Sequence, residues 1–194
     1  VWFLLIYAFI ASTLPVWALL QPRDYINSHQ LIIGLIAIIA GIAIMQPQVV
    51  APVFQANPQG APSWFPFLFV TIACGAISGF HGLVSSGTTS KQVRHWKDAR
   101  AIGYGAMICE GTLAILATLA VTAGFESSSD WHQHYASWGE AKGLSAAISA
   151  FVMGSARFIE GAGIPKSYAQ TMMSVLIISF AATSLDTATR IQRY

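Results

Sequence analysis

The sequence predicts an all-α, polytopic transmembrane helix bundle. Of its 194 residues 55% are hydrophobic and only 9% are charged, whereas charged residues make up about 25% of an average soluble domain. The apolar residues also lie in long blocks instead of alternating with polar residues. A helix needs roughly 20 apolar residues to cross the hydrocarbon core of a bilayer, and several of the blocks approach that length. These observations indicate that lipid surrounds much of the chain.

Five apolar blocks predict five membrane-spanning helices. The expected spans lie near residues 1–20, 29–46, 64–82, 101–124 and 167–186. Prolines recur through residues 46–66, so an extended loop is expected there. Residues 143–159 are apolar but interrupted by serines and an arginine, which favours a re-entrant or interfacial helix. We expect residues 1–194 to form a single transmembrane domain and to be a fragment of a longer protein, because apolar or helical patterns run to both ends.

The first block contains a predicted kink. Pro15 removes one helical hydrogen bond, and the hydroxyls of Ser12 and Thr13 can satisfy the carbonyl groups that it frees. Residues 21–25 then form a compact polar exit from the membrane, whose arginine and aspartate could pair across the interface.

The basic residues predict the orientation of the chain, because positively charged loops stay in the cytoplasm. One side of the predicted membrane carries Arg23, Lys91, Arg94, Lys97, Arg100, Arg190 and Arg193, against Lys142, Arg157 and Lys166 on the other. The polar loop at 125–142 should therefore face outward. The net charge is only +2 and the basic residues form no single stripe, so nucleic acid is not an expected partner.

A hydroxyl-rich segment at residues 79–91 is the first candidate site. It follows an apolar helix, loses its apolar character abruptly and contains glycines beside several serines and threonines. A broken helix that lines a cavity has this composition, and its N–H and hydroxyl groups can hold a carboxylate or phosphate. The candidate substrate-binding residues are His81, Ser85, Ser86, Gly87, Thr88 and Thr89. Helix caps at a membrane exit would explain the same pattern, and His81 could equally be solvated or capping.

Two acidic residues are candidates for proton or cation coupling. Glu110 lies well inside the fourth predicted span, where an ionised carboxylate costs about 3 kcal/mol, so it should face the protein interior. It would act as a relay or form a structural hydrogen bond to a neighbouring helix. Asp186 closes the fifth predicted span among several threonines, where it could bind a proton or sodium, pair with Arg190 one turn later, or be an ordinary charge at a helix end.

Metal and cofactor sites are not expected. His132 and His134 lie two residues apart in a polar loop without a fixed third ligand. Cys74 and Cys109 lie in separate apolar blocks, where thiols behave as small hydrophobic groups.

Four stretches of the chain resemble the carbon starvation protein A (CstA) family. They are residues 21–27, residues 78–92 with the sequence Ser-Gly-Phe-His running into Ser-Ser-Gly-Thr-Thr-Ser-Lys-Gln, residues 104–111, and Leu-Asp-Thr-Ala-Thr-Arg at 185–190. The resemblance implies a multi-pass carrier of the bacterial inner membrane, with a fold similar to the amino acid, polyamine and organocation carriers. Its expected solutes are pyruvate or short peptides, taken up with a proton or sodium ion.

The predicted function is therefore secondary transport, with hydroxyl and N–H groups at 85–90 holding the carboxylate of the solute and Glu110 exchanging the coupling proton. The expected partners are the solute, the coupling ion, the lipid bilayer and the remaining helices of the longer chain. Two alternatives come from other classes. One is an intramembrane enzyme that uses His81, a serine at 85 or 86 and Glu110, and the other is a sensor subunit that binds a ligand without transport.

Overall fold

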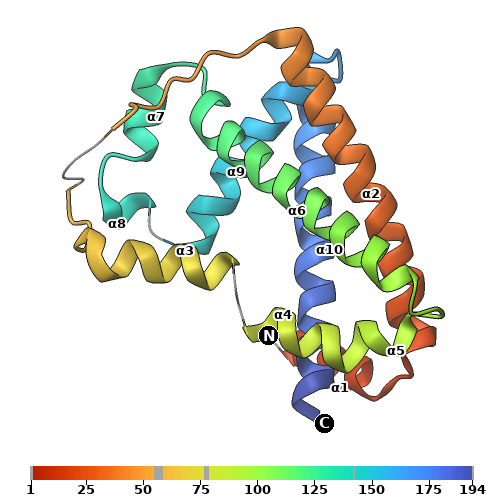
Figure 1. Cartoon of the computed structure of the whole chain (residues 1–194). Coiled ribbons are helices and arrows are strands. Elements are labelled where there is room, and N and C mark those ends of the chain that lie inside the picture. Colours follow the sequence, from red (N-terminus) through yellow and green to blue (C-terminus); the bar gives the residue numbers. More distant parts are fainter. Residues whose placement is uncertain (1, 55–58, 77–78, 142, 194) are drawn as a thin grey trace. The chain divides into compact units, whose positions relative to one another are not determined.

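The computed structural model describes residues 2–54, 59–76, 79–141 and 143–193 (Figure 1). Over these residues the chain forms helices, turns and loops but no strand, which confirms the predicted all-α class for the part described. The residues divide into two compact units. The first unit comprises residues 1–29, 63–106 and 177–194, and the second comprises residues 30–62 and 107–176.

Three helices of the described chain are long and apolar enough to cross a membrane. They are Gln21–Met45, Asp98–Ala123 and Lys166–Gln192, and Trp64–Gly75 is a shorter apolar helix. The three long helices correspond to the second, fourth and fifth predicted spans. The third predicted span includes residues 77 and 78, which lie outside the described residues.

The first predicted span, near 1–20, is wrong as a single helix. Helix α1 covers Trp2–Thr13 and helix α2 covers Val16–Met45, so the chain breaks at Leu14 and Pro15. Proline disfavours the helical conformation of the residue before it and lacks the N–H that would continue the ladder. We expected Pro15 to kink a continuous helix, but the helix is interrupted completely between Thr13 and Val16.

The hydroxyl groups before the break donate to helix carbonyls, but not to the carbonyl of Ala11, which is the one that Pro15 frees. Ser12 Oγ donates to the carbonyl of Phe9 at 2.8 Å, and Thr13 Oγ1 donates to the carbonyl of Ile10 at 2.8 Å. The carbonyl of Ile10 also accepts from the N–H of Leu14 at 3.1 Å, and the carbonyl of Ala11 accepts from Nη2 of Arg190 at 3.2 Å.

The polar exit predicted at residues 21–25 is also wrong, because these residues continue the helix inside α2. Pro22 lies in the second turn of α2, where it removes only one helical hydrogen bond. The nearby side chains of Arg23 and Asn27 find polar partners on helix α10, Lys166–Arg193. Because these partners belong to the protein itself, the polar side chains of Arg23 and Asn27 do not need to reach water.

The first unit also contains the hydroxyl-rich segment and the short helices next to it in the sequence. Trp64–Leu68 (η1) is a π-type turn in which Phe65 has an extended backbone, and helix α3 follows at Phe69–Ala76. Helix α4 (Gly79–Val84) leads into a second π-type turn, Ser85–Thr89 (η2), and then into the short helix α5 (Ser90–Gln92). The helical hydrogen-bond register thus changes at the serines and threonines.

The second unit has an apolar core between four helices. These are the second half of α2, the end of helix α6 (Asp98–Ala123), helix α9 (Leu144–Gly161) and the start of α10. The buried side chains of the core are Leu35, Ile38, Leu116, Ala120, Ala123, Ala156, Phe158, Ile159, Ala169 and Met173. Burial of this many apolar side chains positions α9 against the longer helices.

Glycines let the helices of the second unit approach closely. A Cβ atom added at Gly41 would overlap the carbonyl of Phe158, and one added at Gly154 would overlap the carbonyl of Ala120. Small residues at such crossings bring helix backbones into van der Waals contact, which is a common way to pack helices in membranes.

Residues 143–159, predicted as a re-entrant or interfacial helix, form the main part of α9. The preceding polar stretch contains the short helices α7 (Ser128–His134) and α8 (Trp138–Ala141). The predicted extended loop after α2 is present from residue 46 to residue 63, apart from residues 55–58, which are not described. The N–H groups of Val50 and Ala51 both donate to the carbonyl of Thr122, at 3.0 and 3.2 Å, and so attach this loop to α6.

Candidate functional site

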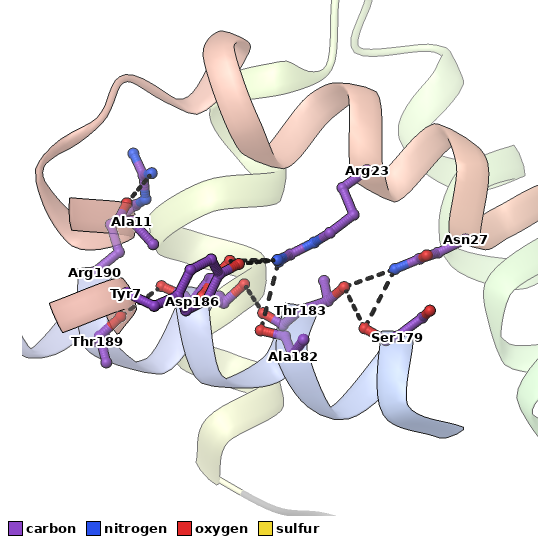
Figure 2. Close-up of polar contacts among 11 residues, drawn as sticks. Tyr7, Ala11, Arg23, Asn27, Ser179, Ala182, Thr183, Asp186, Thr189 and Arg190 are labelled. Atoms are coloured by element: carbon purple, nitrogen blue, oxygen red, sulfur yellow. Dashed lines mark hydrogen bonds and ion pairs between the residues drawn. The ribbon is translucent and has the colours of Figure 1, made fainter. Parts of the chain in front are cut away.

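A buried ion pair lies in the first unit, between α2 and the C-terminal part of α10. The carboxylate of Asp186 has no exposed surface, and its Oδ2 atom lies 2.5 Å from Nη1 of Arg23, whose side chain is 19% exposed. Figure 2 shows the two side chains pointing toward one another from the two helices. Charged groups inside a membrane protein are costly to bury and usually mark functional sites.

Tyr7 of α1 bridges the two charges. Nη1 of Arg23 donates to the Tyr7 hydroxyl at 2.8 Å, and that hydroxyl donates to Oδ2 of Asp186 at 3.1 Å. The break at Pro15 allows α1 to run separately from α2. The side chain of Tyr7 can therefore contact both Arg23 and Asp186. Three helical segments therefore meet at one carboxylate (Figure 2).

Polar groups beside the ion pair join α2 to α10 one turn further along. Nδ2 of Asn27 donates to Oγ1 of Thr183 at 2.7 Å and to the carbonyl of Ser179 at 3.4 Å. Nη2 of Arg23 lies 3.5 Å from the carbonyl of Ala182. We call Tyr7, Arg23, Asn27, Thr183 and Asp186 the buried polar network.

Arg190 makes a separate contact with α1. Its Nη2 atom donates to the carbonyl of Ala11 at 3.2 Å, and its side chain is buried. The partner of Asp186 is thus Arg23 and not Arg190, so the predicted pairing within the last turn is wrong. Asp186 is also not a charge at a helix end, because α10 continues to Arg193. The guanidinium of Arg190 instead fixes the end of α1 against α10.

Three buried polar atoms of this region have no hydrogen-bond partner among the described residues. They are Oδ1 of Asp186, Nε of Arg23 and Nε of Arg190. An unsatisfied buried acceptor costs about 1–3 kcal/mol. Oδ1 is therefore the oxygen of the Asp186 carboxylate that neither Arg23 nor Tyr7 contacts.

Asp186 was predicted as a coupling residue from the sequence, but its partners were missed. Arg23 was expected in the polar exit at residues 21–25, where it could pair with Asp24, and Tyr7 lies within the first predicted span. Arg23 and Asn27 lie four residues apart, which places them on one face of a helix. That spacing was the available signal, although it could not identify Asp186 as the partner across a separation of more than 150 residues.

The hydroxyl-rich segment satisfies its own backbone. Oγ of Ser85 and Oγ of Ser86 both donate to the carbonyl of Gly82, at 3.1 and 2.8 Å, and Oγ of Ser90 donates to the carbonyl of Ser86 at 2.7 Å. His81, Ser85, Ser86, Gly87 and Thr89 are exposed, and the side chain of Thr88 lies outside the described residues. A π-type turn at this point is notable, because such turns occur frequently at functional sites.

Glu110 lies on α6 in the second unit and is exposed. Among the described residues it has no ion pair or hydrogen bond to another side chain. Its predicted enclosure by protein therefore stays a prediction about the longer protein. The same holds for its predicted cooperation with the hydroxyl-rich segment, which belongs to the first unit.

A buried carboxylate, a guanidinium and a phenol meet in this arrangement, and one carboxylate oxygen has no partner among the described residues. A hydrolytic site would require a base next to a nucleophile. The hydroxyls of Ser85 and Ser86 instead donate to backbone carbonyls. The hydroxyl protons of Ser85 and Ser86 are thus engaged by the backbone of the preceding helix.

Comparison with known proteins gives a family match over most of the chain. Residues 1–128 match the family described as carbon starvation protein CstA. The match includes Tyr7, Arg23 and the hydroxyl-rich segment, and it ends before α9 and α10.

Several curated proteins are similar to this chain over about three fifths of its length. The peptide transporter CstA of Bacillus subtilis (strain 168) is 45% identical over 124 residues, which is 61% of this chain and 21% of that protein. The pyruvate/proton symporter BtsT of Escherichia coli (strain K12) is 46% identical over 121 residues, 60% of this chain and 17% of that protein. The peptide transporter CstA of Helicobacter pylori (strain J99 / ATCC 700824) is 47% identical over 122 residues, covering 60% and 18%.

The aligned part of the chain thus corresponds to about a fifth of the length of these relatives. No solved structure matches the chain. The names of the relatives and the three apolar helices together indicate a membrane protein.

Proposed function

The chain belongs to the carbon starvation protein CstA family, and from this we propose that it is part of a secondary transporter that takes up pyruvate or short peptides with a proton. The names of two relatives supply the solute classes, since one is a peptide transporter and another a pyruvate/proton symporter. The aligned part is only about a fifth of each relative, so the activity is proposed for a longer protein of which this chain is a part.

The single observation that carries the coupling mechanism is the buried pair of Arg23 and Asp186. When Asp186 is ionised, it neutralises Arg23 and accepts a hydrogen bond from Tyr7. When Asp186 takes up a proton, Arg23 loses its counter-ion in a site that is largely shielded from water, which is strongly unfavourable. The contact between α2 and α10 then weakens, so that proton binding favours a different arrangement of the two helices.

The proposed solute site is the hydroxyl-rich segment, with Ser85, Ser86, Gly87 and Thr89 exposed around the π-type turn. His81 and the side chain of Thr88 complete the proposed set. These hydroxyls now donate to carbonyls of their own helices, and a bound carboxylate would compete for the same protons. Glu110 is proposed as a second coupling residue, enclosed by helices of the longer protein.

The proposed location is the bacterial inner membrane, crossed several times. Lys91, Arg94 and Lys97 precede α6 and Arg100 lies in its first turn, whereas the first basic residue after its end is Lys142. By the positive-inside rule the start of α6 is cytoplasmic and the polar loop at 125–142 faces outward. A five-span arrangement related to the amino acid, polyamine and organocation carriers remains part of this proposal.

The proposal is tested by solute uptake into proteoliposomes that contain the full-length protein. Labelled pyruvate and labelled L-alanyl-L-alanine would be supplied separately under an inward proton gradient, an inward sodium gradient, or neither. The proposal predicts that at least one solute accumulates, and that only the proton gradient drives accumulation. Liposomes without protein provide the background rate.

Three results would contradict the proposal. Accumulation driven by sodium alone would exclude the proton as the coupling ion. Equal uptake with and without a gradient would indicate a channel or facilitator. Binding of either solute without any flux would favour the sensor alternative. A Glu110→Gln variant that accumulates solute normally across the neutral pH range would remove Glu110 from the mechanism.

A further inference from the structure

A cavity of about 490 Å³ lies in the second unit, and the residues of the buried polar network belong to the first unit. The segment after α6, helix α7, helix α9 and the start of α10 all contribute to its wall. The side chains on which the inference rests are Glu126, Asp130, His134, Arg157 and Lys166. Sites for small organic ligands typically have volumes of about 300–1,000 Å³.

The cavity carries charges of both signs. Arg157 and Lys166 supply cationic groups, and Glu126 and Asp130 supply carboxylates. Nη1 of Arg157 donates to the carbonyl of Phe125, which holds the guanidinium in place and leaves its other N–H groups available for a carboxylate.

The remaining charges are free to exchange partners. Nζ of Lys166 lies 3.8 Å from Oε1 of Glu126, but the two side chains are 57% and 72% exposed. An exposed pair of this kind contributes little stability, so a ligand can replace either member. Asp130 accepts a hydrogen bond from Ser127 at 2.7 Å, which fixes its carboxylate at the start of α7.

The imidazole of His134 adds an unsatisfied polar group to the cavity. Its Nε2 atom is buried and has no hydrogen-bond partner within the described parts of the chain. The ring packs against Phe125 and Tyr135, with centroids 5.5 and 4.9 Å apart. These ring contacts fix the imidazole in the wall of the cavity.

We propose that this cavity binds a small zwitterion, an amino acid or a short peptide, with its carboxylate at Arg157 and Lys166 and its ammonium group at Glu126 and Asp130. Pyruvate has a carboxylate but no ammonium group, so it would leave the acidic half unused. His134, Arg157 and Lys166 all lie beyond residue 128, where the family match ends. The family match therefore does not include these three side chains of the cavity.

The use of this site for solute capture rests on the proposed transport function, but its occupancy can be measured without transport. The experiment measures binding affinity by isothermal titration calorimetry of the full-length protein in detergent with four probes. These are L-alanyl-L-alanine, its N-acetylated form, its C-terminal amide and pyruvate. The inference predicts that L-alanyl-L-alanine binds at least about tenfold more tightly than the other three, because each of them lacks one of the two charges.

Two pairs of variants locate the binding. Lys166→Gln and Asp130→Asn should each weaken binding of L-alanyl-L-alanine about tenfold. Glu160→Gln, at an exposed position on α9, and Lys97→Gln, at an exposed position before α6, should leave the affinity unchanged. All four changes lie at exposed side chains, so each variant is expected to fold.

Equal affinities for the free and the N-acetylated peptide, or unchanged affinity in both Lys166→Gln and Asp130→Asn, would overturn the inference. Peptide binding that follows the predicted pattern in a protein without proton-driven flux would support the cavity and refute the transport proposal. Proton-driven flux without such binding would support the transport proposal and refute the proposed zwitterion site in the cavity.

Discussion

The ion pair between Arg23 and Asp186 makes a quantitative prediction about stability. Replacing Arg23 by glutamine leaves a carboxylate without exposed surface and without its counter-ion. Asp186 is 0% exposed and Arg23 is 19% exposed, so the energetics of a buried ion pair apply. Removing one partner of a buried pair costs about 3–5 kcal/mol, whereas an exposed pair contributes only about 0–1 kcal/mol.

A double-mutant cycle separates this interaction from other effects of the substitutions. Arg23→Gln and Asp186→Asn should each lower the free energy of unfolding by about 3–5 kcal/mol. The double variant has no unpaired charge, so its loss should be smaller than the sum by about 3 kcal/mol. Unfolding of the full-length protein would be followed by tryptophan fluorescence during titration with sodium dodecyl sulfate in mixed micelles.

The exposed pair of Lys166 and Glu126 provides a matched control. The same cycle with Lys166→Gln and Glu126→Gln should give an interaction free energy below about 1 kcal/mol, because both side chains are mainly exposed. If the losses from Arg23→Gln and Asp186→Asn were additive, or if the two cycles gave the same interaction free energy, the reasoning from burial would be refuted.

Three further predictions follow from individual contacts. Tyr7→Phe removes the hydroxyl that joins Arg23 to Asp186 and should lower the free energy of unfolding by about 1.5–3 kcal/mol; an unchanged unfolding midpoint would argue against the bridge. Gly154→Leu should abolish folding, because a Cβ at this position would overlap the carbonyl of Ala120, and the variant should aggregate in size-exclusion chromatography. Gly111→Leu should stay monodisperse, because no atom lies within 4 Å of a Cβ added there. Burial raises the pKa of Tyr135 above its usual value near 10, so this residue contributes stability that is present below pH 10 and is lost as pH rises through the folded pKa; Tyr135→Phe should flatten that loss in alkaline unfolding curves.

Hydrophobic block length predicted the long helices well. The block at 167–186 lies within a helix that is long and apolar enough to span a membrane, and the blocks at 29–46 and 101–124 each extend only one residue beyond such a helix. Such blocks are readable because lipid imposes one requirement on every residue of the span, namely an apolar side chain and an internally satisfied backbone.

Polar residues were harder to interpret, because a polar residue can mark either a membrane exit or a contact inside the protein. Residues 21–25 were predicted to leave the membrane, yet Arg23 stays in α2 and contacts Asp186. The difference depends on a partner more than 150 residues away, which no local pattern reveals. Asp186 could be identified as a candidate because an acidic residue in an apolar helix is costly by itself. Its partner could be found only from the packing of α1, α2 and α10.

The central claim is that protonation of Asp186 couples solute movement to the proton gradient. The most direct measurement compares two assays of the Asp186→Asn variant of the full-length protein in proteoliposomes. Exchange of labelled for unlabelled solute requires no net proton movement, whereas accumulation against a gradient does. The account predicts that Asp186→Asn retains exchange but loses proton-driven accumulation, while Asp98→Asn retains both. Normal proton-driven accumulation by Asp186→Asn would contradict it.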